Sequence, residues 1–297
     1  MDTSLIEAFI ALVDCKNFTK AAESLCISQS ALSYRLDHLE KELDAQLILR
    51  SRGRRGFGLT QTGTEFIPLA ERWLALAQDT VHFKNDTRQQ MLSISCVETI
   101  SFRFAKLYKS IIDEQPFLLS LHTYNSPQTI TDVEDQIIDI GFTVRERASR
   151  NVEVVPLFSE HHYLLGCLAS DRRTIDPRTL DPHDELLTDW GSTFRAWHDS
   201  YFGLDHRPLA EVDTASSVFN YLADGVWCIV PASAVPFLQT ISATYGHPVQ
   251  VYEMTAPPPD RICYKVINRT PRPNRIDSIR YFEERLDIFL RENDLHL

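Results

Sequence analysis

Hydrophobic residues near the start of the chain recur with the period of a helix. Three sets show it: Leu5, Phe9, Leu12 and Val13; Phe18, Ala21, Ala22 and Leu25; and Leu32, Leu36, Leu39 and Leu43. Such spacing predicts one helix over residues 4–14 and two more that follow it. Cys26-Ile27-Ser28 breaks the pattern between the second and third, and Ser28 is a good N-cap. The two alanines allow a close, steep approach, so residues 18–43 are predicted to form a helix-turn-helix.

The polar side of the third helix carries hydrogen-bonding side chains near its N-terminus. Gln29, Ser30, Ser33 and Tyr34 are short or planar, and Arg35 completes the set. Groups of this kind reach base edges and phosphates in a DNA major groove. The alternative is an ordinary amphipathic helix pair whose polar face is only solvated.

A basic hairpin is predicted after this helix. Residues 46–50 and 58–60 look like two short strands, and Gly53 and Gly56 supply the turn between them. Four arginines fall within six residues: Arg50, Arg52, Arg54 and Arg55. Next to a helix-turn-helix, this hairpin is expected to be a wing that contacts the DNA backbone or a minor groove. A solvated charged loop is the alternative.

A long helix is predicted over residues 62–86. Thr62-Gly63-Thr64-Glu65 reads as a capping box that opens it. Its apolar seam has heptad-like spacing and consists of Phe66, Ala70, Trp73, Ala77 and Thr80. We interpret it as a linker helix that pairs with its counterpart in a second subunit. The alternative is that it packs against its own C-terminal domain.

Strands and helices alternate from about residue 90 onward. Strands are predicted at 92–96, 118–124, 137–144, 154–158, 163–168, 226–230, 249–253 and 262–267. Helices are predicted at 102–114, from 131–136, at 218–222 and at 276–290. This order implies a mostly parallel sheet.

Candidate ligand contacts follow from that pattern. Ligands of open α/β sheets lie beyond the strand C-termini and near helix N-termini. The residues in such places are Thr99, Ser101, Asn125, Thr143 and Arg145, and in the later part Trp190, Ser192, Thr214 and Ser216. Hydroxyls and helix N-terminal amides suit an anion, Arg145 could add a bidentate contact, and Trp190 could pack on an apolar part. Serine and threonine are also simply favoured as N-caps.

The N-terminal residues resemble those of LysR-type transcriptional regulators. The resemblance rests on Phe18–Ala22, Leu25, Ser28–Ser33, Leu39–Leu43, Leu47, Arg50, Leu59, Thr60 and Gly63. It is specific over residues 1 to about 65 and more diffuse beyond. It adds Thr19 and Ser28 to the expected DNA contacts.

The resemblance implies an α+β multidomain fold. Its parts are a winged helix-turn-helix over 1–60, a linker or dimerisation helix over 61–89 and a periplasmic-binding-protein-like effector-binding domain over 90–297. That domain should contain two α/β subdomains joined by two crossing strands: about 90–160 with 268–297, and about 161–267. A small molecule should bind in the cleft between them, and its closure should change the spacing of the DNA-binding heads.

Several residues depart from the family pattern. Ser30 stands where proline is usual, Tyr34 where arginine is usual, and Asp44, Ile48 and Thr62 where glycine, phenylalanine and alanine are usual. Asp44 still suits a helix C-terminus, because aspartate tolerates a left-handed conformation. Ser30 and Tyr34 are expected to change which DNA sequence is read.

Charge is unevenly distributed over the 297 residues. The net charge is −11, but residues 1–65 hold eight basic and nine acidic residues, so the acidic excess lies in the C-terminal part. A local basic patch, rather than the total charge, meets phosphate. No apolar run is long enough for a membrane span, and the acidic N-terminus is not a secretory signal, so we expect a cytoplasmic protein.

Catalytic and metal motifs do not emerge from the sequence. There is no G-x-S-x-G elbow, P-loop, G-x-G-x-x-G or H-E-x-x-H, and the six cysteines form no C-x-x-C pair. A redox-sensing cysteine pair remains an alternative to buried structural cysteines. His161 and His162 should point to opposite faces of a strand, which makes them a poor metal pair. We therefore expect neither an enzyme nor a cofactor or metal.

The expected partners are double-stranded DNA, a small-molecule effector, further copies of the chain as a dimer of dimers, and RNA polymerase. A rival hypothesis is a periplasmic-type solute receptor, which the second half alone would fit. Residues 18–60 count against it.

Overall fold

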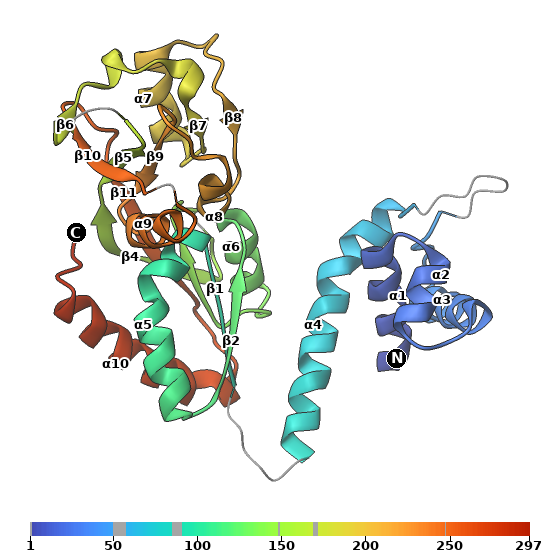
Figure 1. The fold of residues 1–297 in the computed structure, drawn as a ribbon. Coiled ribbons are helices and arrows are strands. Elements are labelled where there is room, and N and C mark those ends of the chain that lie inside the picture. The colour runs from blue at the N-terminus through green and yellow to red at the C-terminus, as the bar shows by residue number, and fades with distance from the viewer. Residues whose placement is uncertain (1, 50–57, 85–90, 148, 169–171, 247) are drawn as a thin grey trace. The chain divides into compact units, whose positions relative to one another are not determined.

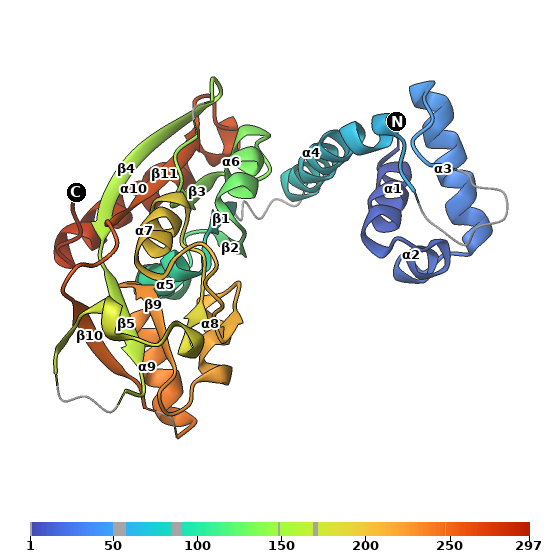
Figure 2. The same cartoon turned by 90° about the horizontal axis from the view of Figure 1, so that it is seen from above.

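The computed structural model describes residues 2–49, 58–84, 91–147, 149–168, 172–246 and 248–297 (Figures 1 and 2). The chain divides into two compact units. One comprises Met1–Gln89 with Asp135–Ile137, and the other comprises Gln90–Glu134 with Ile138–Leu297.

The N-terminal unit begins with the three predicted helices. They are α1 (Thr3–Cys15), α2 (Phe18–Ser24) and α3 (Gln29–Leu43). The Ser28 hydroxyl accepts a hydrogen bond from the Ala31 backbone N–H at 3.1 Å, which confirms its predicted N-cap role. Asp44 ends α3 with φ of 49°, in the left-handed conformation expected for it.

One hydrophobic core joins these helices. Its buried members include Leu5, Phe9 and Leu12 from α1, Ala21 and Ala22 from α2, and Leu32, Leu36 and Leu39 from α3. The periodicity seen in the sequence is therefore the buried face of each helix. The two alanines leave α2 no bulk on its inner side, which lets α1 and α3 pack against it closely.

A short antiparallel pairing follows α3. Ile48 and Leu59 form a bridge, and the Leu49 N–H donates to the Gly58 carbonyl at 2.9 Å. This pairing joins the two segments that were predicted to be the strands of the wing. The turn between them, with Arg50, Arg52, Arg54 and Arg55, lies outside the described residues.

The long helix α4 spans Gln61–Lys84, and its first turn differs from the prediction. Thr60 caps it, because its hydroxyl accepts from the Gly63 N–H at 2.9 Å. The predicted capping box starting at Thr62 is therefore wrong, since the chain enters the helix two residues earlier than that motif requires.

The apolar seam of α4 is also displaced from the prediction. Phe66 packs on Phe9 of α1 with ring centroids 5.4 Å apart, and Ala70 is buried in the same core. Among the side chains of α4 that the structure describes, Leu69, Trp73 and Leu76 are exposed and apolar, and they share one helix face at i, i+4 and i+7. Phe66 and Ala70 thus belong to the core of their own unit.

The first sheet of the C-terminal unit has the order β2-β1-β3-β11-β4. Its strands are β1 (Met91–Cys96), β2 (Leu118–Thr123), β3 (Ile140–Thr143), β4 (Val152–Glu160) and β11 (Arg261–Asn268). Helices α5 (Glu98–Glu114) and α10 (Ile276–Glu292) pack on one face through Phe104 and Phe282. Helix α6 (Ser126–Glu134) lies on the other, where Ser95 hydrogen-bonds Thr129 at 2.8 Å.

The second sheet has the order β6-β10-β5-β9. Its strands are β5 (His162–Gly166), β6 (Thr174–Ile175), β9 (Trp227–Pro231) and β10 (Gln250–Met254), with β7 (Leu186–Leu187) and β8 (Ala210–Glu211) paired beside it. Helix α7 (Ser192–Phe202) packs on one face through Phe194. Helices α8 (Ala215–Val218) and α9 (Val235–Thr244) pack on the other through Val218 and Leu238.

Four single turns of 3-10 helix complete the described elements. They span Pro177–Thr179, Pro182–Asp184, Phe219–Tyr221 and Pro273–Arg275.

Two segments cross between the sheets, and one lies elsewhere than predicted. Glu160 ends β4 and His162 begins β5, which agrees with the expected crossing. The second crossing falls between Met254 and Arg261, because β11 pairs with β3 and β4. Residues 261–267 therefore belong with the first sheet rather than the second subdomain. Pro257–Pro259 cannot donate ladder hydrogen bonds, so pairing resumes only after them.

Strand direction and several helix bounds also differ from the predictions. In the first sheet β1, β2, β3 and β4 all run in the same direction, and only β11, which lies between β3 and β4, is antiparallel to its neighbours. Both sheets are thus mixed. Helices α5 and α6 begin four and five residues earlier than predicted, and α7 and α9 were not predicted at all.

Among the described residues, no helix is both long and apolar enough to cross a membrane.

Replacement of Gly63 tests the junction between the hairpin and α4. A Cβ at this position would lie 2.1 Å from the Leu47 carbonyl oxygen. Alanine normally stabilises a helix interior over glycine by about 1 kcal/mol. Here we expect Gly63→Ala to lower the free energy of unfolding by about 1–3 kcal/mol, measured by urea denaturation. The exposed Thr62→Ala is the control, and a Gly63→Ala protein as stable as that control contradicts the packing described.

Candidate functional site

The N-terminal half of α3 presents polar side chains to solvent. Gln29, Ser30 and Tyr34 are exposed, and Tyr34 retains 70% of its accessible surface. Ser33 and Arg35 are half-buried and lie on opposite flanks of this face, as the helical angle between them requires. The burial of Leu32, Leu36 and Leu39 holds this face outward, so it is available to a partner.

The other predicted DNA contacts lie around the start of α2 and α3. Thr19 is exposed in the first turn of α2, and its N–H is bound by the Asn17 side chain at 2.9 Å. Ser28 uses its hydroxyl to cap α3 and lies 2.9 Å from the hydroxyl of Ser30. Ser28 thus combines a structural role with a position next to the exposed residues Gln29 and Ser30.

A cleft of about 470 Å³ lies within the C-terminal unit, between the two sheets. Its lining residues from the side of the first sheet are Val97, Glu98, Thr99, Thr123, Tyr124, Asn125, Ser126, Pro127, Val144, Arg145 and Arg261; those from the second are Asp189, Trp190, Asp213, Thr214 and Ala215. A neighbouring cavity of about 350 Å³ shares Val144, Arg145, Trp190 and Arg261 with it. Both subdomains contribute walls, so a bound molecule would touch each of them.

Six of the nine predicted effector contacts line these cavities. Thr99, Asn125, Arg145, Trp190 and Thr214 line the larger one, and Ser192 lines the neighbouring one. The indole N–H of Trp190 donates to the Ile229 carbonyl at 2.6 Å, which fixes the ring at the edge of the cleft. Arg145 is exposed and, among the described residues, has no ion-pair partner.

The remaining three do not line either cavity. Ser101 lies inside α5 and interacts with the thiol of Cys96, because that helix begins before it. Thr143 is buried and donates its hydroxyl to the Arg145 carbonyl at 3.1 Å. Ser216 donates its hydroxyl and its N–H to Glu98. Thr143 and Ser216 therefore contact residues that line the cleft but do not line it themselves.

Arg261 is a cleft residue that sequence reasoning missed. Its Nε donates to Glu160 at 2.6 Å, and its Nη2 donates to Thr99 at 2.5 Å and to Ser233 at 3.2 Å. Its Cζ lies 5.5 Å from the centroid of Trp190. The available signal was a pair of opposite charges at the ends of two strands that cross between the sheets.

Glu160 neutralises this buried arginine. The burial of Glu160 raises its pKa, but the charge and hydrogen bonds of Arg261, a hydrogen bond from Ser233 and the charge of Arg103 together hold the pKa below its usual value. The carboxylate is therefore ionised at neutral pH, and the pair cancels much of the positive charge that Arg261 would otherwise bring to the cleft.

His162 lies beside this pair and lines the smaller cavity. Burial, together with the positive charge of Arg261, lowers the pKa of His162 from 6.5 to about 4. His161 is exposed and pairs with Asp260. The two adjacent histidines thus point to opposite sides of the chain, as predicted.

Carboxylates also reach the larger cleft. Glu98 is occupied by Ser216, while Asp189 accepts from the Gly191 N–H at 2.8 Å and lies 3.7 Å from Arg195. Asp213 is exposed. Arg145 therefore brings a positive charge to the cleft lining, while Asp189 and Asp213 favour hydrogen-bond donors on a ligand.

An exposed polar helix on a helix-turn-helix and a ligand-sized cleft between two α/β sheets define a ligand-responsive DNA-binding protein. Comparison with known families agrees with this class. Residues 3–64 match the model described as "Bacterial regulatory helix-turn-helix protein, lysR family", and residues 85–244 match "LysR substrate binding domain". The chain belongs to the LysR family and is a transcriptional regulator with a DNA-binding domain and an effector-binding domain.

Individual relatives are more distant. The HTH-type transcriptional regulator HdfR of Escherichia coli O139:H28 (strain E24377A / ETEC) is 26% identical over 234 residues, which cover 75% of this chain and 79% of HdfR. The crystal structure of CbnR, a LysR family transcriptional regulator, superimposes with a TM-score of 0.70 at 19% identity, covering 96% of this chain and 99% of CbnR. Full-length OxyR C199D from Pseudomonas aeruginosa gives 0.61 at 21% identity, covering 96% and 94%. At these identities the structures show a shared fold.

The lowered pKa of His162 predicts a pH-dependent stability. The unfolded chain takes up a proton at this residue below pH 6.5, but the folded chain does so only below about pH 4. Stability should therefore fall as the pH drops from 6.5 to 4, by about 3 kcal/mol in total. Urea denaturation followed by tryptophan fluorescence across this range measures it.

His162→Gln should flatten that pH dependence, whatever its effect on stability at pH 7. His161→Gln, at the exposed neighbouring position, should retain it. Equal slopes for the two variants are incompatible with a buried, neutral His162.

Proposed function

We propose that the chain reads double-stranded DNA with the N-terminal half of α3 placed in the major groove. The observation that carries this proposal is the exposed face formed by Gln29, Ser30 and Tyr34, which the buried leucines of α3 direct to solvent. Amide and hydroxyl groups at the start of a recognition helix form hydrogen bonds to base edges. CbnR, whose fold this chain shares with a TM-score of 0.68, has been solved in complex with its target DNA.

Other residues of α2 and α3 are proposed to contact the DNA phosphates on either side of the major groove. They are Thr19, Ser28, Ser33 and Arg35. Sequence reasoning adds the wing arginines Arg50, Arg52, Arg54 and Arg55 along the backbone or a minor groove. The affinity should then fall steeply with salt, since each neutralised phosphate releases counterions.

Pairing of two chains would place two reading helices at a fixed spacing. Leu69, Trp73 and Leu76 form an exposed apolar row on α4 and are the surface we assign to this dimer. We further propose that two such dimers associate and that the DNA-bound assembly contacts RNA polymerase. Because its DNA target lies in the bacterial cytoplasm, the protein is proposed to act there. It would act by binding alone, without a catalytic step.

The effector proposed for the cleft is a small molecule with an anionic group at one end. Arg145 is the charge that would hold that group, because Arg261 is already paired with Glu160. Trp190 would pack on its apolar part. Asp189 and Asp213 favour hydrogen-bond donors elsewhere on the same molecule.

Closure of the cleft around that molecule would bias the assembly toward one spacing of its DNA-binding heads. Both subdomains line the cleft, so a ligand that touches both favours the closed arrangement by its differential affinity. DNA binding or bending then changes as a coupled equilibrium.

Gln29→Ala tests the reading surface. On a duplex enriched from a random library by the wild-type protein, we expect it to lose about 1–3 kcal/mol of binding free energy, roughly 5- to 150-fold in affinity, measured by fluorescence anisotropy at fixed salt. The control is Gln239→Ala, the same change on the exposed surface of α9. The assignment of α3 fails if the two variants bind the duplex equally well.

Arg145→Gln tests the effector class. In a thermal-shift panel of small carboxylates, amines and neutral compounds, carboxylates should stabilise the wild-type protein most. Arg145→Gln should reduce their binding by about 1.5–3 kcal/mol, and Arg150→Gln, an exposed arginine outside the cleft lining, should not. Stabilisation by amines alone, or equal carboxylate binding by both variants, would refute an anionic effector held by Arg145.

A further inference from the structure

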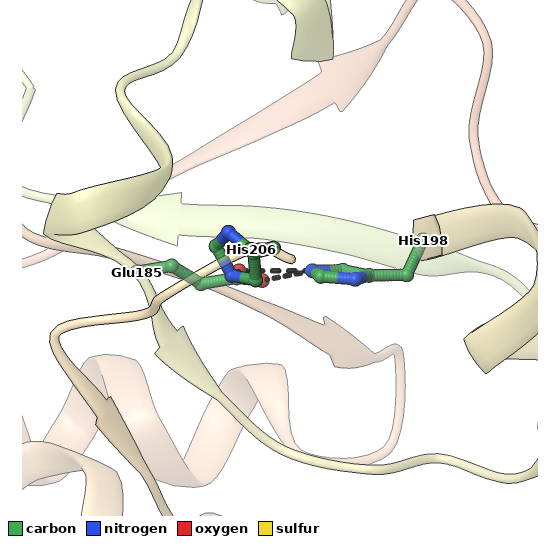
Figure 3. A group of neighbouring side chains, drawn as sticks. All are labelled: Glu185, His198 and His206. Carbon is green, nitrogen blue, oxygen red and sulfur yellow. Dashed lines mark hydrogen bonds and ion pairs between the residues drawn. The ribbon is translucent and has the colours of Figure 1, made fainter. Parts of the chain in front are cut away.

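A second polar cluster lies in the second subdomain, away from the residues that line the cleft. It consists of Glu185, His198 and His206, whose side chains converge in Figure 3. Glu185 comes just before β7, His198 lies in α7, and His206 lies in the loop between α7 and β8. Three separate segments thus bring one carboxylate and two imidazoles together.

The cluster is almost fully buried. Glu185 is 0% exposed, His198 is 1% exposed, and the His206 side chain is 4% exposed. The rings of Phe194 and Phe202 lie 5.8 and 4.8 Å from that of His198. Ionisable groups in such surroundings are costly unless something neutralises and binds them.

Hydrogen bonds within the cluster leave one imidazole unsatisfied. His198 Nε2 donates to the Glu185 carboxylate at 2.9 and 3.1 Å. His206 Nε2 lies 2.8 Å from the same carboxylate, yet neither ring nitrogen of His206 has a hydrogen-bond partner among the described residues. The distance is short but the geometry is not that of a hydrogen bond, so this buried nitrogen is left unsatisfied, and a cation held by both groups would satisfy it.

The spacing of the donor atoms suits such a cation. One ligand atom from each residue can be chosen so that all three lie within 4.8 Å of one another. In a tetrahedral zinc site, ligands about 2.0–2.2 Å from the ion lie roughly 3.3 Å apart. The pairs at 2.8 and 2.9 Å need to open by only about half an ångström to reach that spacing.

We propose that Glu185, His198 and His206 bind a divalent transition ion of the zinc type. Two imidazoles and one carboxylate match Zn²⁺ or Co²⁺ better than Mg²⁺ or Ca²⁺, which prefer oxygen alone. The three protein donors leave a further coordination position for water. Leu204, two residues before His206, is 87% exposed, so the loop that carries this ligand lies at the surface and offers an entry route.

The site is joined to the effector cleft by α7. His198 lies on this helix, whose first residue, Ser192, lines the smaller cavity. Phe194 contacts both His198 and His162, another residue of that cavity, with ring centroids 5.8 and 5.7 Å apart respectively. A bound ion fixes α7 against the segments that carry Glu185 and His206, and so holds one wall of the cavity in place.

The test uses the full-length chain without a histidine tag, after treatment with a chelator. Calorimetric titration with Zn²⁺ should show one saturable site per chain, and the ion should raise the unfolding temperature. The Co²⁺ form should show the strong visible absorption of a low-coordinate site. X-ray absorption of the Zn²⁺ form should show two imidazoles in the coordination shell.

Variants separate this site from adventitious binding to other histidines. Glu185→Gln and His206→Asn should each weaken Zn²⁺ binding at least about 10-fold, whereas His183→Asn, an exposed histidine paired with Asp181, should not. The proposal is overturned if wild-type protein shows no saturable site, or if the cluster variants bind as it does. If the variants do not fold, the number of imidazoles around Zn²⁺ in the wild-type protein decides the question.

Discussion

The ion pair between Arg261 and Glu160 holds the C-terminal unit together where its two sheets meet. Arg261 begins β11, Glu160 ends β4, and the two residues are register partners at the crossing. Arg261 also binds Thr99 at the start of α5 and Ser233 ahead of α9, so one guanidinium joins four elements. Because both charges are buried, removal of Glu160 would leave Arg261 without its carboxylate partner, at a cost of about 3–5 kcal/mol. Arg261 therefore both lines the cleft and holds together the elements that form it.

The two units use their polar residues in different ways. On α3, the residues proposed to read DNA are exposed and contribute little to folding, since Leu32, Leu36 and Leu39 supply the core beneath them. In the cleft, Thr99 and Trp190 are already hydrogen-bonded within the protein. Arg145 stands apart because it faces the cleft without an ion-pair partner in the described part of the chain. This contrast is why the effector proposal rests on its charge.

The helix-turn-helix was predictable from sequence because its determinants are local. Leucine spacing, the Ser28 cap and the left-handed Asp44 each act within one or two turns. The cleft depends on contacts between distant residues: Thr99 and Arg261 are 162 positions apart. Sequence alone could place Arg145 and Trp190 at strand ends, but not Arg261, the crossing before β11 or the Glu185–His198–His206 cluster. Each of those requires the topology that brings separate segments together.

The central claim is that this chain is a paired, sequence-specific DNA reader. Selection of bound fragments from the source genome by purified wild-type protein at moderate salt, followed by sequencing, tests it most directly. The account predicts enrichment of a few sites that share a roughly two-fold symmetric motif, because two copies of α3 must contact the DNA at a fixed spacing. Uniform enrichment across the genome, with no shared motif, would contradict it.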